Sequence, residues 1–353
     1  MMAATSRHIL LTVKENVSLT ALDAATGETV AVVEVSTSQS SKPHELTLSR
    51  DRRHAFVSLY GSADYGPNVP DNRIAVVDLT SMSLAGHISL DLYKGPHALV
   101  TGTDGKIWVT VDHSRCLLVI DPESWQIEHT LWLEVPGHFL AMAPDGNTLY
   151  ASAKEYPVIV EVDMAARVIT GRLSVPVGAQ AIRVSKDGGR LFVGDFNRPL
   201  LHVLDTRTRA LTATYRMAGV PGWPFVSPDG RYLAVTTYNE ADDQGFLELF
   251  DADTMDLHRS IELPGEPFHV LFTEDSSQLY VVQADGDLPL IDIASASIVE
   301  GGMPAGGTMP VALVDWDGPT HSVPLPQGEG SGLRGKALSG KKSPRSVTPH
   351  PAL

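Results

Sequence analysis

The sequence has only one cysteine, Cys116, among its 353 residues. A single thiol excludes an internal disulfide framework, and sparse cysteine is typical of proteins in a reducing compartment. Cys116 directly precedes the apolar segment LLVID. We therefore expect a cytoplasmic protein whose one thiol is packed in the core rather than reactive.

Long hydrophobic runs and positive charge are also scarce. No stretch approaches the roughly 20 apolar residues of a membrane-spanning helix, and no secretory cleavage site follows the short apolar run near the N-terminus. The sequence has 27 Lys and Arg against 42 Asp and Glu, which gives a net charge of −15. This balance argues against nucleic acid, which is bound through Lys and Arg, and against an anionic membrane surface.

Several motifs of common enzyme classes are missing as well. The sequence contains no GxSxG nucleophile elbow, no GxxxxGK[ST] phosphate loop and no GxGxxG after a strand. The sequence therefore predicts no nucleotide cofactor, and its spacing suggests no Ser-His-Asp triad.

What the sequence does have is an internal repeat. Short apolar runs that end in aspartate recur at intervals of roughly 40–55 residues. The aspartates are Asp23, Asp78, Asp121, Asp163, Asp205, Asp251 and Asp292. An aspartate carboxylate can accept hydrogen bonds from backbone amides just after it and so close a tight turn. Seven such turns predict seven repeats.

A second recurring element lies between the aspartate turns. Segments such as LAMAPDGNTLYAS and FVSPDGRYLAVT read as a strand, an Asp-Gly turn and another strand, which is a strong hairpin signal. Each repeat thus holds four short strands, and four strands in about 40–45 residues are typical of a propeller blade. We predict an all-β fold, a seven-bladed β-propeller with four-stranded antiparallel blades.

The two ends of the propeller are predicted to share one blade. Residues 8–35 supply three strands, and the segment TMPVALVD at 308–315 supplies the missing inner strand. This pairing leaves no exposed sheet edge. After Asp317 the sequence is basic, poor in apolar residues and rich in Gly, Pro and Ser. We therefore predict a propeller over 1–317 and a disordered tail over 318–353.

Three repeats carry a family resemblance: GVPGWPFVSPDGRYLAVTT, LEVPGHFLAMAPDGNTLYASA and GAQAIRVSKDGGRLFVGD. They resemble the repeat of the YVTN, or YncE-like, propellers over about residues 8–315, which implies a seven-bladed fold. More distantly, the chain is similar to the bacterial lactonase and streptogramin-lyase propellers, and EPFHVLF resembles a lactonase repeat. Many YncE-like proteins are exported, and this sequence departs from them by lacking a signal.

Histidines gather at one position of the repeat. Seven residues before each hairpin aspartate stand, in order, His44, His97, His138, Gln180, Gly222 and Phe268. The residues that follow them are Glu45, Ala98, Phe139, Ala181, Trp223 and His269. Because these positions begin the inner strands, we expect the histidines to converge at one mouth of the central channel.

Several imidazoles in one place suit a transition metal such as Fe, Cu or Zn. An open coordination position would make such a centre catalytic. We predict His44, His97 and His138 as metal ligands. His269 is a fourth candidate, but it lies one residue out of register and needs a bulge to point inward. The alternative is a water-lined channel in which the imidazoles bond backbone carbonyls.

Three further residues are catalytic candidates at the same mouth. Glu45 could orient a ligand histidine or act as a general base, or it could be a solvated carboxylate. Trp223 could line the substrate site or cap the core, and His113 lies in a short loop on this face. The longest loop, 60–72, could form a lid. Cationic candidates for binding a substrate carboxylate or phosphate are Arg115, Lys154 and Arg198.

Three functions remain open. The first is a metal-dependent enzyme that acts on a small organic molecule through the histidine cluster. The second, which the family resemblance implies, is a lactonase- or lyase-type enzyme that uses His and Glu for acid–base work. The third is a non-catalytic propeller that presents its loops to a protein partner.

Overall fold

The computed structural model describes residues 7–14, 17–38, 40–62, 69–284, 286–299, 303–304 and 309–316. For residues 7–14, 303–304 and 309–316 only the backbone is described. The predicted tail, residues 318–353, and residues 63–68 of the predicted lid lie outside this part of the chain. The domain boundary and the lid therefore stay predictions.

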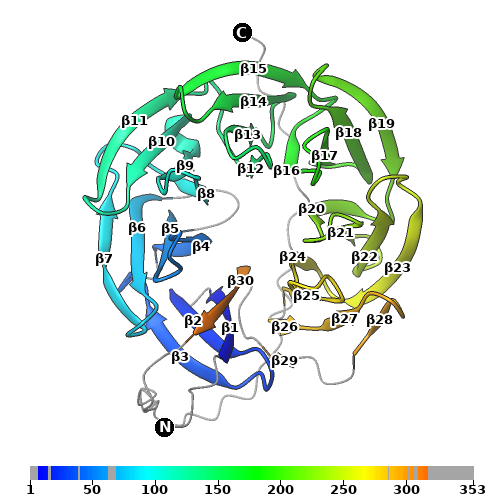
Figure 1. Ribbon diagram of the computed structural model, residues 1–353, viewed down its shortest axis with the longest axis horizontal. Coiled ribbons are helices and arrows are strands. Elements are labelled where there is room, and N and C mark those ends of the chain that lie inside the picture. Colours follow the sequence, from blue (N-terminus) through cyan, green and yellow to red (C-terminus); the bar gives the residue numbers. More distant parts are fainter. Residues whose placement is uncertain are drawn as a thin grey trace. The chain divides into compact units, whose positions relative to one another are not determined.

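Seven four-stranded antiparallel sheets surround an open centre (Figure 1). The inner strands are β4 (Lys42–Leu48), β8 (Pro96–Thr101), β12 (Leu140–Met142), β16 (Ala179–Val184), β20 (Val220–Val226), β24 (Pro267–Phe272) and β30 (Met309–Trp316). The second strands are β5 (His54–Gly61), β9 (Ile107–Val111), β13 (Thr148–Ser152), β17 (Arg190–Asp195), β21 (Tyr232–Asn239), β25 (Gln278–Gln283) and β1 (Arg7–Lys14). This arrangement confirms the predicted seven-bladed propeller.

Two more strands complete each blade. The third strands are β6 (Pro70–Asp78), β10 (Cys116–Asp121), β14 (Val158–Asp163), β18 (Leu200–Asp205), β22 (Gln244–Asp251), β27 (Leu290–Asp292) and β2 (Ser18–Asp23). The outer strands are β7 (Ser83–Ser89), β11 (Gln126–Trp132), β15 (Val168–Ser174), β19 (Ala210–Arg216), β23 (Leu257–Pro264), β28 (Ser297–Ile298) and β3 (Thr29–Glu34). A short 3-10 helix, Asp112–Ser114, and the small strand pair β26 (Asp287–Leu288) and β29 (Met303–Pro304) lie outside this scheme.

The first and last strands of the propeller lie in one blade, as predicted. Strand β30 pairs antiparallel with β1, and the order of this sheet is β3-β2-β1-β30. Around the centre, each inner strand contacts the next, from β4 through β24 to β30 and back to β4. In Figure 1 the orange β30 lies beside the blue β1.

The seven repeat aspartates close the turns between the third and outer strands. Each accepts a hydrogen bond from a backbone amide two or three residues further on. Asp78, for example, accepts from the amides of Thr80 and Ser81, both at 2.8 Å. These contacts confirm the turn chemistry predicted from the sequence.

The hydrophobic core lies between neighbouring blades. We number the blades in chain order from the one that contains β4, so that β4–β7 form the first blade and β8–β11 the second. One buried cluster joins Phe56 and Ile74 of the first blade to Val109 and Leu118 of the second. Cys116 is fully buried in this cluster, and burial raises the pKa of its thiol to about 12. The prediction of a thiol packed in the core is confirmed. Among the described residues, no helix is long and apolar enough to cross a membrane.

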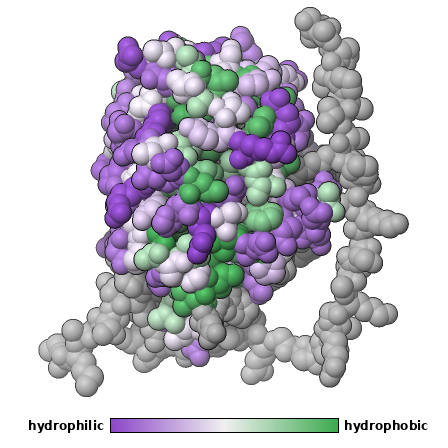
Figure 2. All heavy atoms as spheres, turned by 90° about the vertical axis from the view of Figure 1, so that its right-hand side faces the viewer, coloured by the Kyte–Doolittle hydropathy of each residue, from purple (hydrophilic) through white to green (hydrophobic). Residues whose placement is uncertain are grey.

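The outer strands form the rim of the molecule. Figure 2 shows one side of this rim, where hydrophobic residues occur in separate patches among hydrophilic ones. The outer strands β19, β23 and β28 expose single large apolar side chains, which are Leu211, Leu257 and Ile298.

Candidate functional site

A β-bulge lies at the predicted site position in five inner strands, β4, β8, β16, β20 and β24. In β4 the register shifts between Pro43 and Leu46, so that the two residues between them face one residue of β5. A bulge re-aims the side chains beside it. The bulge that His269 requires is present, because the register of β24 shifts between Pro267 and Val270.

Hydroxyl groups on the second strands hold these bulges in place. Thr110 accepts a hydrogen bond from the amide of Ala98 at 3.0 Å and donates to the carbonyl of His138 in the next blade at 2.9 Å. Ser58 donates in the same way to the carbonyl of His97, at 2.8 Å. The backbone on which the histidines stand is therefore tied from blade to blade.

The side chains of His44, His97 and His138 lie in a row along the first three blades. The ring centroids of His44 and His97 are 4.2 Å apart, and those of His97 and His138 are 4.1 Å apart. All three residues are buried, with relative exposures of 6%, 3% and 8%. Three histidines that lie about 40 to 50 residues apart in the sequence are thus neighbours in the fold.

The protonation of this row follows from its burial. Burial, together with the nearby His138 and His44, lowers the pKa of His97 well below its usual value. Burial also lowers the pKa of His138, followed in effect by Lys154 and His44. His138 Nδ1 lies 2.8 Å from the carbonyl oxygen of Gln180, which only accepts, so Nδ1 carries the proton. In the neutral ring, the Nε2 atom of His138 then carries no proton and keeps its lone pair.

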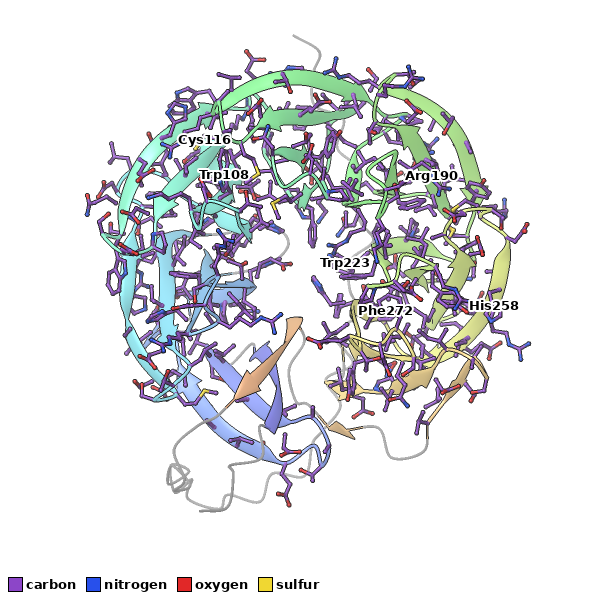
Figure 3. The ribbon with its side chains drawn as sticks, in the orientation of Figure 1. Trp108, Cys116, Arg190, Trp223, His258 and Phe272 are labelled. Carbon is purple, nitrogen blue, oxygen red and sulfur yellow. The ribbon has the colours of Figure 1, made fainter. Side chains whose placement is uncertain are left out.

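The next repeat position, one residue after that of the three histidines, carries Glu45, Phe139, Trp223 and His269. We call these four side chains the second layer and the three histidines the first. Glu45 Oε1 lies 3.3 Å from His269 Nε2 and 3.8 Å from His44 Nδ1. The ring of His269 packs against Trp223 at 5.0 Å and against Phe139 at 5.9 Å. A carboxylate and an imidazole from different blades therefore meet in an aromatic surrounding. Trp223 lies beside the open centre, whereas Trp108 and Cys116 lie deeper within the second blade (Figure 3).

Several buried polar atoms of these two layers lack hydrogen bonds. The side-chain atoms without a hydrogen-bond partner within the described part of the chain include Glu45 Oε1, His97 Nδ1, Trp223 Nε1 and His269 Nε2. Glu45 and His269 are close enough for an ion pair but are not aligned for a hydrogen bond. Unpaired buried groups are rare in proteins, and each asks for an explanation.

The metal site stays a prediction, and three observations bear on it. The imidazoles of His44, His97 and His138 are adjacent, and neutral imidazole is the form that binds a metal. His269 contacts the aromatic residues and Glu45 rather than this row. In the described ranges, no group of three or more His, Cys, Asp or Glu is arranged to hold a metal ion. A metal would require the imidazoles to turn toward a common point.

Tyr60 and His113 lie at the rim of the histidine row. The ring of Tyr60 packs against both His44 and His97 at 5.3 Å, and its hydroxyl donates to Asp112 at 2.8 Å. His113 is 6.0 Å from Tyr60 and has a half-exposed side chain next to Asp112. His113 thus contacts Tyr60 and Asp112.

The predicted cationic residues have other contacts. Arg198 donates from Nε and from one terminal nitrogen to Asp195 Oδ2, at 2.9 and 2.6 Å, and Lys154 lies over the ring of Phe196 at 5.3 Å. Arg115 ends the 3-10 helix with a left-handed backbone. The cation that the sequence analysis missed is Arg183, which stacks on Phe225 with 4.9 Å between its guanidinium carbon and the ring.

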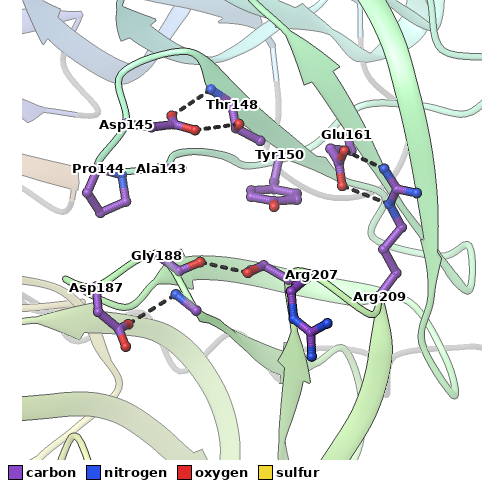
Figure 4. A pocket seen from close by; sticks show the side chains of 12 residues that line it. Ala143, Pro144, Asp145, Thr148, Tyr150, Glu161, Asp187, Gly188, Arg207 and Arg209 are labelled. Carbon is purple, nitrogen blue, oxygen red and sulfur yellow. Dashed lines mark hydrogen bonds and ion pairs between the residues drawn. The ribbon is translucent and has the colours of Figure 1, made fainter.

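A pocket of 470 Å³ lies at the opposite ends of the inner strands, between the third and fourth blades (Figure 4). Its polar groups pair with one another: Arg209 binds Glu161 at 2.7 and 3.0 Å, and Asp145 accepts from Thr148. None of the described residues that line this pocket has a buried side-chain atom without a hydrogen-bond partner.

No protein-family model and no curated protein matches the sequence. Among solved structures, the chain is similar to a functionally unknown protein from Desulfotomaculum acetoxidans DSM 771, with a TM-score of 0.68 and 13% identity over 88% of this chain and 99% of that one. It is also similar to Kuenenia stuttgartiensis hydrazine synthase, with a TM-score of 0.62 and 14% identity over 78% and 96%. A component of the mitotic checkpoint complex gives a TM-score of 0.62 and 16% identity over 74% and 79%. At these identities the likeness shows the fold alone.

Proposed function

We propose that the channel mouth is the active site of an enzyme that performs acid–base chemistry on a small organic molecule. The observation that carries this proposal is a group of buried polar atoms without hydrogen-bond partners, on Glu45, His97, Trp223 and His269. Each such atom costs about 1–3 kcal/mol, which a bound polar ligand would offset. The Trp223 indole only donates, and an ionised Glu45 only accepts. The ligand therefore offers both an acceptor and a donor.

Glu45 and His269 supply the chemistry. Glu45 Oε1 takes a proton from an attacking water, whose oxygen then bonds to the carbonyl carbon of the substrate. As the ring C–O bond of a lactone breaks, an imidazole beside the carboxylate gives a proton to the leaving oxygen. The separation of 3.3 Å between His269 Nε2 and Glu45 Oε1 supports His269 in this role. Glu45 then returns the proton it took from water to His269 Nε2. The products are a hydroxy acid and an enzyme in its starting protonation state.

Lactone hydrolysis is the form of the proposal that the YVTN-like repeats favour, because that resemblance extends to lactonase propellers. A cytoplasmic location and a small-molecule substrate belong to the same proposal. The test is turnover of a panel of γ- and δ-lactones by untagged protein, followed with a pH indicator in weak buffer. Acid release above the background rate is expected with at least one lactone. Hydrolysis no faster than the background rate for every lactone of the panel would overturn the lactonase assignment.

A transition-metal centre is the second candidate, and the row of neutral imidazoles favours it. His44, His97 and His138 would hold an Fe, Cu or Zn ion, which would polarise a carbonyl or activate water. The proton on His138 Nδ1 leaves Nε2 as the ligand atom, and this arrangement is common for metal-binding histidines.

Metal analysis of untagged protein, reconstituted without oxygen, tests this candidate. The metal proposal expects one transition-metal ion per chain and a large loss of it in His97→Ala. His258→Ala is the matched control, because His258 is exposed on the outer strand β23, away from the centre (Figure 3). Absence of stoichiometric metal, or equal metal in His97→Ala and His258→Ala, would reject the metal centre.

A further inference from the structure

Among the six inner strands that can be aligned on a hairpin aspartate, Arg183 is the one charged residue at its repeat position. It stands two positions after Ala181 on β16, so both side chains face the same side of the strand. The equivalent residues of the other described inner strands are Thr47, Val100, Ala141, Phe225 and Leu271. A cation has therefore been placed in one blade where the other blades carry apolar or hydroxyl side chains.

The contacts of Arg183 involve the face of its guanidinium and its Nε, and they leave its two terminal nitrogens without a partner among the described residues. Its guanidinium lies over the Phe225 ring, and its Nε donates to the carbonyl of Pro224 at 3.4 Å. Phe225 in turn packs against His269 at 5.7 Å, which joins Arg183 to the proposed site. Within the described residues, the two terminal nitrogens of Arg183 make no hydrogen bond and no ion pair.

The electrostatics of the channel add a second observation. Burial lowers the pKa of Arg183 to about 10, and the carboxylate of Glu45 opposes this effect. The two groups influence each other through space, yet neither hydrogen-bonds the other. The channel thus contains a guanidinium and a carboxylate that are held apart, and Glu45 Oε1 has no hydrogen-bond partner among the described residues.

We propose that Arg183 is an anion subsite of the channel and that the substrate carries a carboxylate which binds its two terminal nitrogens. The planar guanidinium matches a carboxylate with two parallel hydrogen bonds, and such pairs are among the strongest in proteins. The reacting group of the same molecule then lies toward Glu45. Calling this ligand a substrate rests on the proposed function, whereas the subsite itself does not.

Calorimetric titration with propionate and with propionamide tests the subsite, because these probes have nearly the same shape and differ in charge. Wild-type protein is expected to bind propionate at least tenfold more tightly than propionamide. R183M should lose at least tenfold in propionate affinity and keep its affinity for propionamide, and R183K should recover part of the loss. R190M is the matched control, because Arg190 pairs with the exposed Asp253.

Equal binding of the two probes by wild-type protein, no binding of propionate, or unchanged propionate binding by R183M would overturn the subsite. A purely structural role for Arg183 predicts that last result. If R183M does not fold, the comparison of R183K and R183Q with wild type decides. Turnover separates this proposal from the function: E45Q should lose lactone hydrolysis and still bind propionate. Loss of hydrolysis in E45Q without propionate binding by wild type would reject the subsite alone.

Discussion

At the scale of single residues, Asp195 in the fourth blade is a buried charge with several hydrogen-bond partners. Its side chain is fully buried and accepts hydrogen bonds from the side chains of Arg198 and His202 and from two backbone amides. Burial alone would raise the pKa of Asp195, but the bonds from His202 and Arg198 outweigh it and lower the pKa. The carboxylate therefore stabilises the folded state in its ionised form.

Asp195→Asn should reduce the free energy of unfolding by roughly 3 kcal/mol at neutral pH, because it leaves His202 and Arg198 without their charged partner. Urea denaturation measures this loss. Asp253→Asn, which removes an exposed pair with Arg190, is the control and should cost under about 1 kcal/mol. Equal losses in the two variants would contradict the account of Asp195.

The same carboxylate gives a pH dependence with a defined sign. Because the pKa of Asp195 is lower in the folded protein, its contribution is complete above the unfolded-state pKa and is lost as pH falls through the folded-state pKa. The stability gap between wild type and Asp195→Asn should therefore narrow between about pH 5 and pH 3. Denaturation curves at several pH values measure the gap, and a gap that widens in acid would contradict this sign.

The site residues differ in how far the sequence reveals them. His44, His97 and His138 share one repeat position, so alignment of the repeats is enough to predict that they lie on one ring. The contact between Glu45 and His269 depends on bulges in two different blades, which alternation of side chains cannot show. Arg183 was missed because its segment, IRVSKDGG, reads as an ordinary strand and turn.

At the scale of elements, the link between blades is a hydroxyl group on the second strand. Ser58, Thr110 and Thr236 each face a bulge and donate to a carbonyl of the next blade. The fourth blade has Gly194 at this position, and no hydroxyl is available there. Repeat alignment could locate these residues, but only the structure shows that they cross from one blade to the next.

Thr110→Val should lower the free energy of unfolding by about 1–3 kcal/mol, because the buried carbonyl of His138 loses its donor while the side-chain shape is kept. Thr212→Val is the matched control: its hydroxyl also donates to a backbone carbonyl, that of Val203, but Thr212 is exposed and water can replace it. Chemical denaturation of both variants measures the difference. A control that is destabilised as much as Thr110→Val would argue against the role of the blade-to-blade link.

At the scale of the whole molecule, the fold could be predicted from the sequence more fully than the function. The aspartate turns and the Asp-Gly hairpins set the number of strands, and the strands left over at the two ends required the pairing of β1 with β30. The chemistry could be predicted less well, because a propeller fold supports many activities and the site depends on side chains from several blades.

Removal of residues 309–353 should abolish cooperative thermal unfolding, because the blade that contains β1 loses its inner strand and exposes a sheet edge. Removal of residues 318–353 alone, the predicted tail, should change Tm by less than about 2 °C. Circular dichroism melts of the two truncated chains provide the comparison. An unchanged melt after loss of 309–353 would refute the structural role of β30, and a large shift after loss of 318–353 would refute the predicted tail.

The central claim is that Glu45, at the channel mouth, carries out proton transfer on a small organic substrate. The most direct measurement is kcat/KM for the best lactone of the panel in wild type, Glu45→Gln and Glu161→Gln, with thermal melts to establish folding. Glu161 is a buried glutamate of the third blade, paired with Arg209 outside the channel mouth. The account predicts that Glu45→Gln lowers kcat/KM by at least about 100-fold while Glu161→Gln stays within about threefold of wild type. A folded Glu45→Gln variant with wild-type kcat/KM would contradict it.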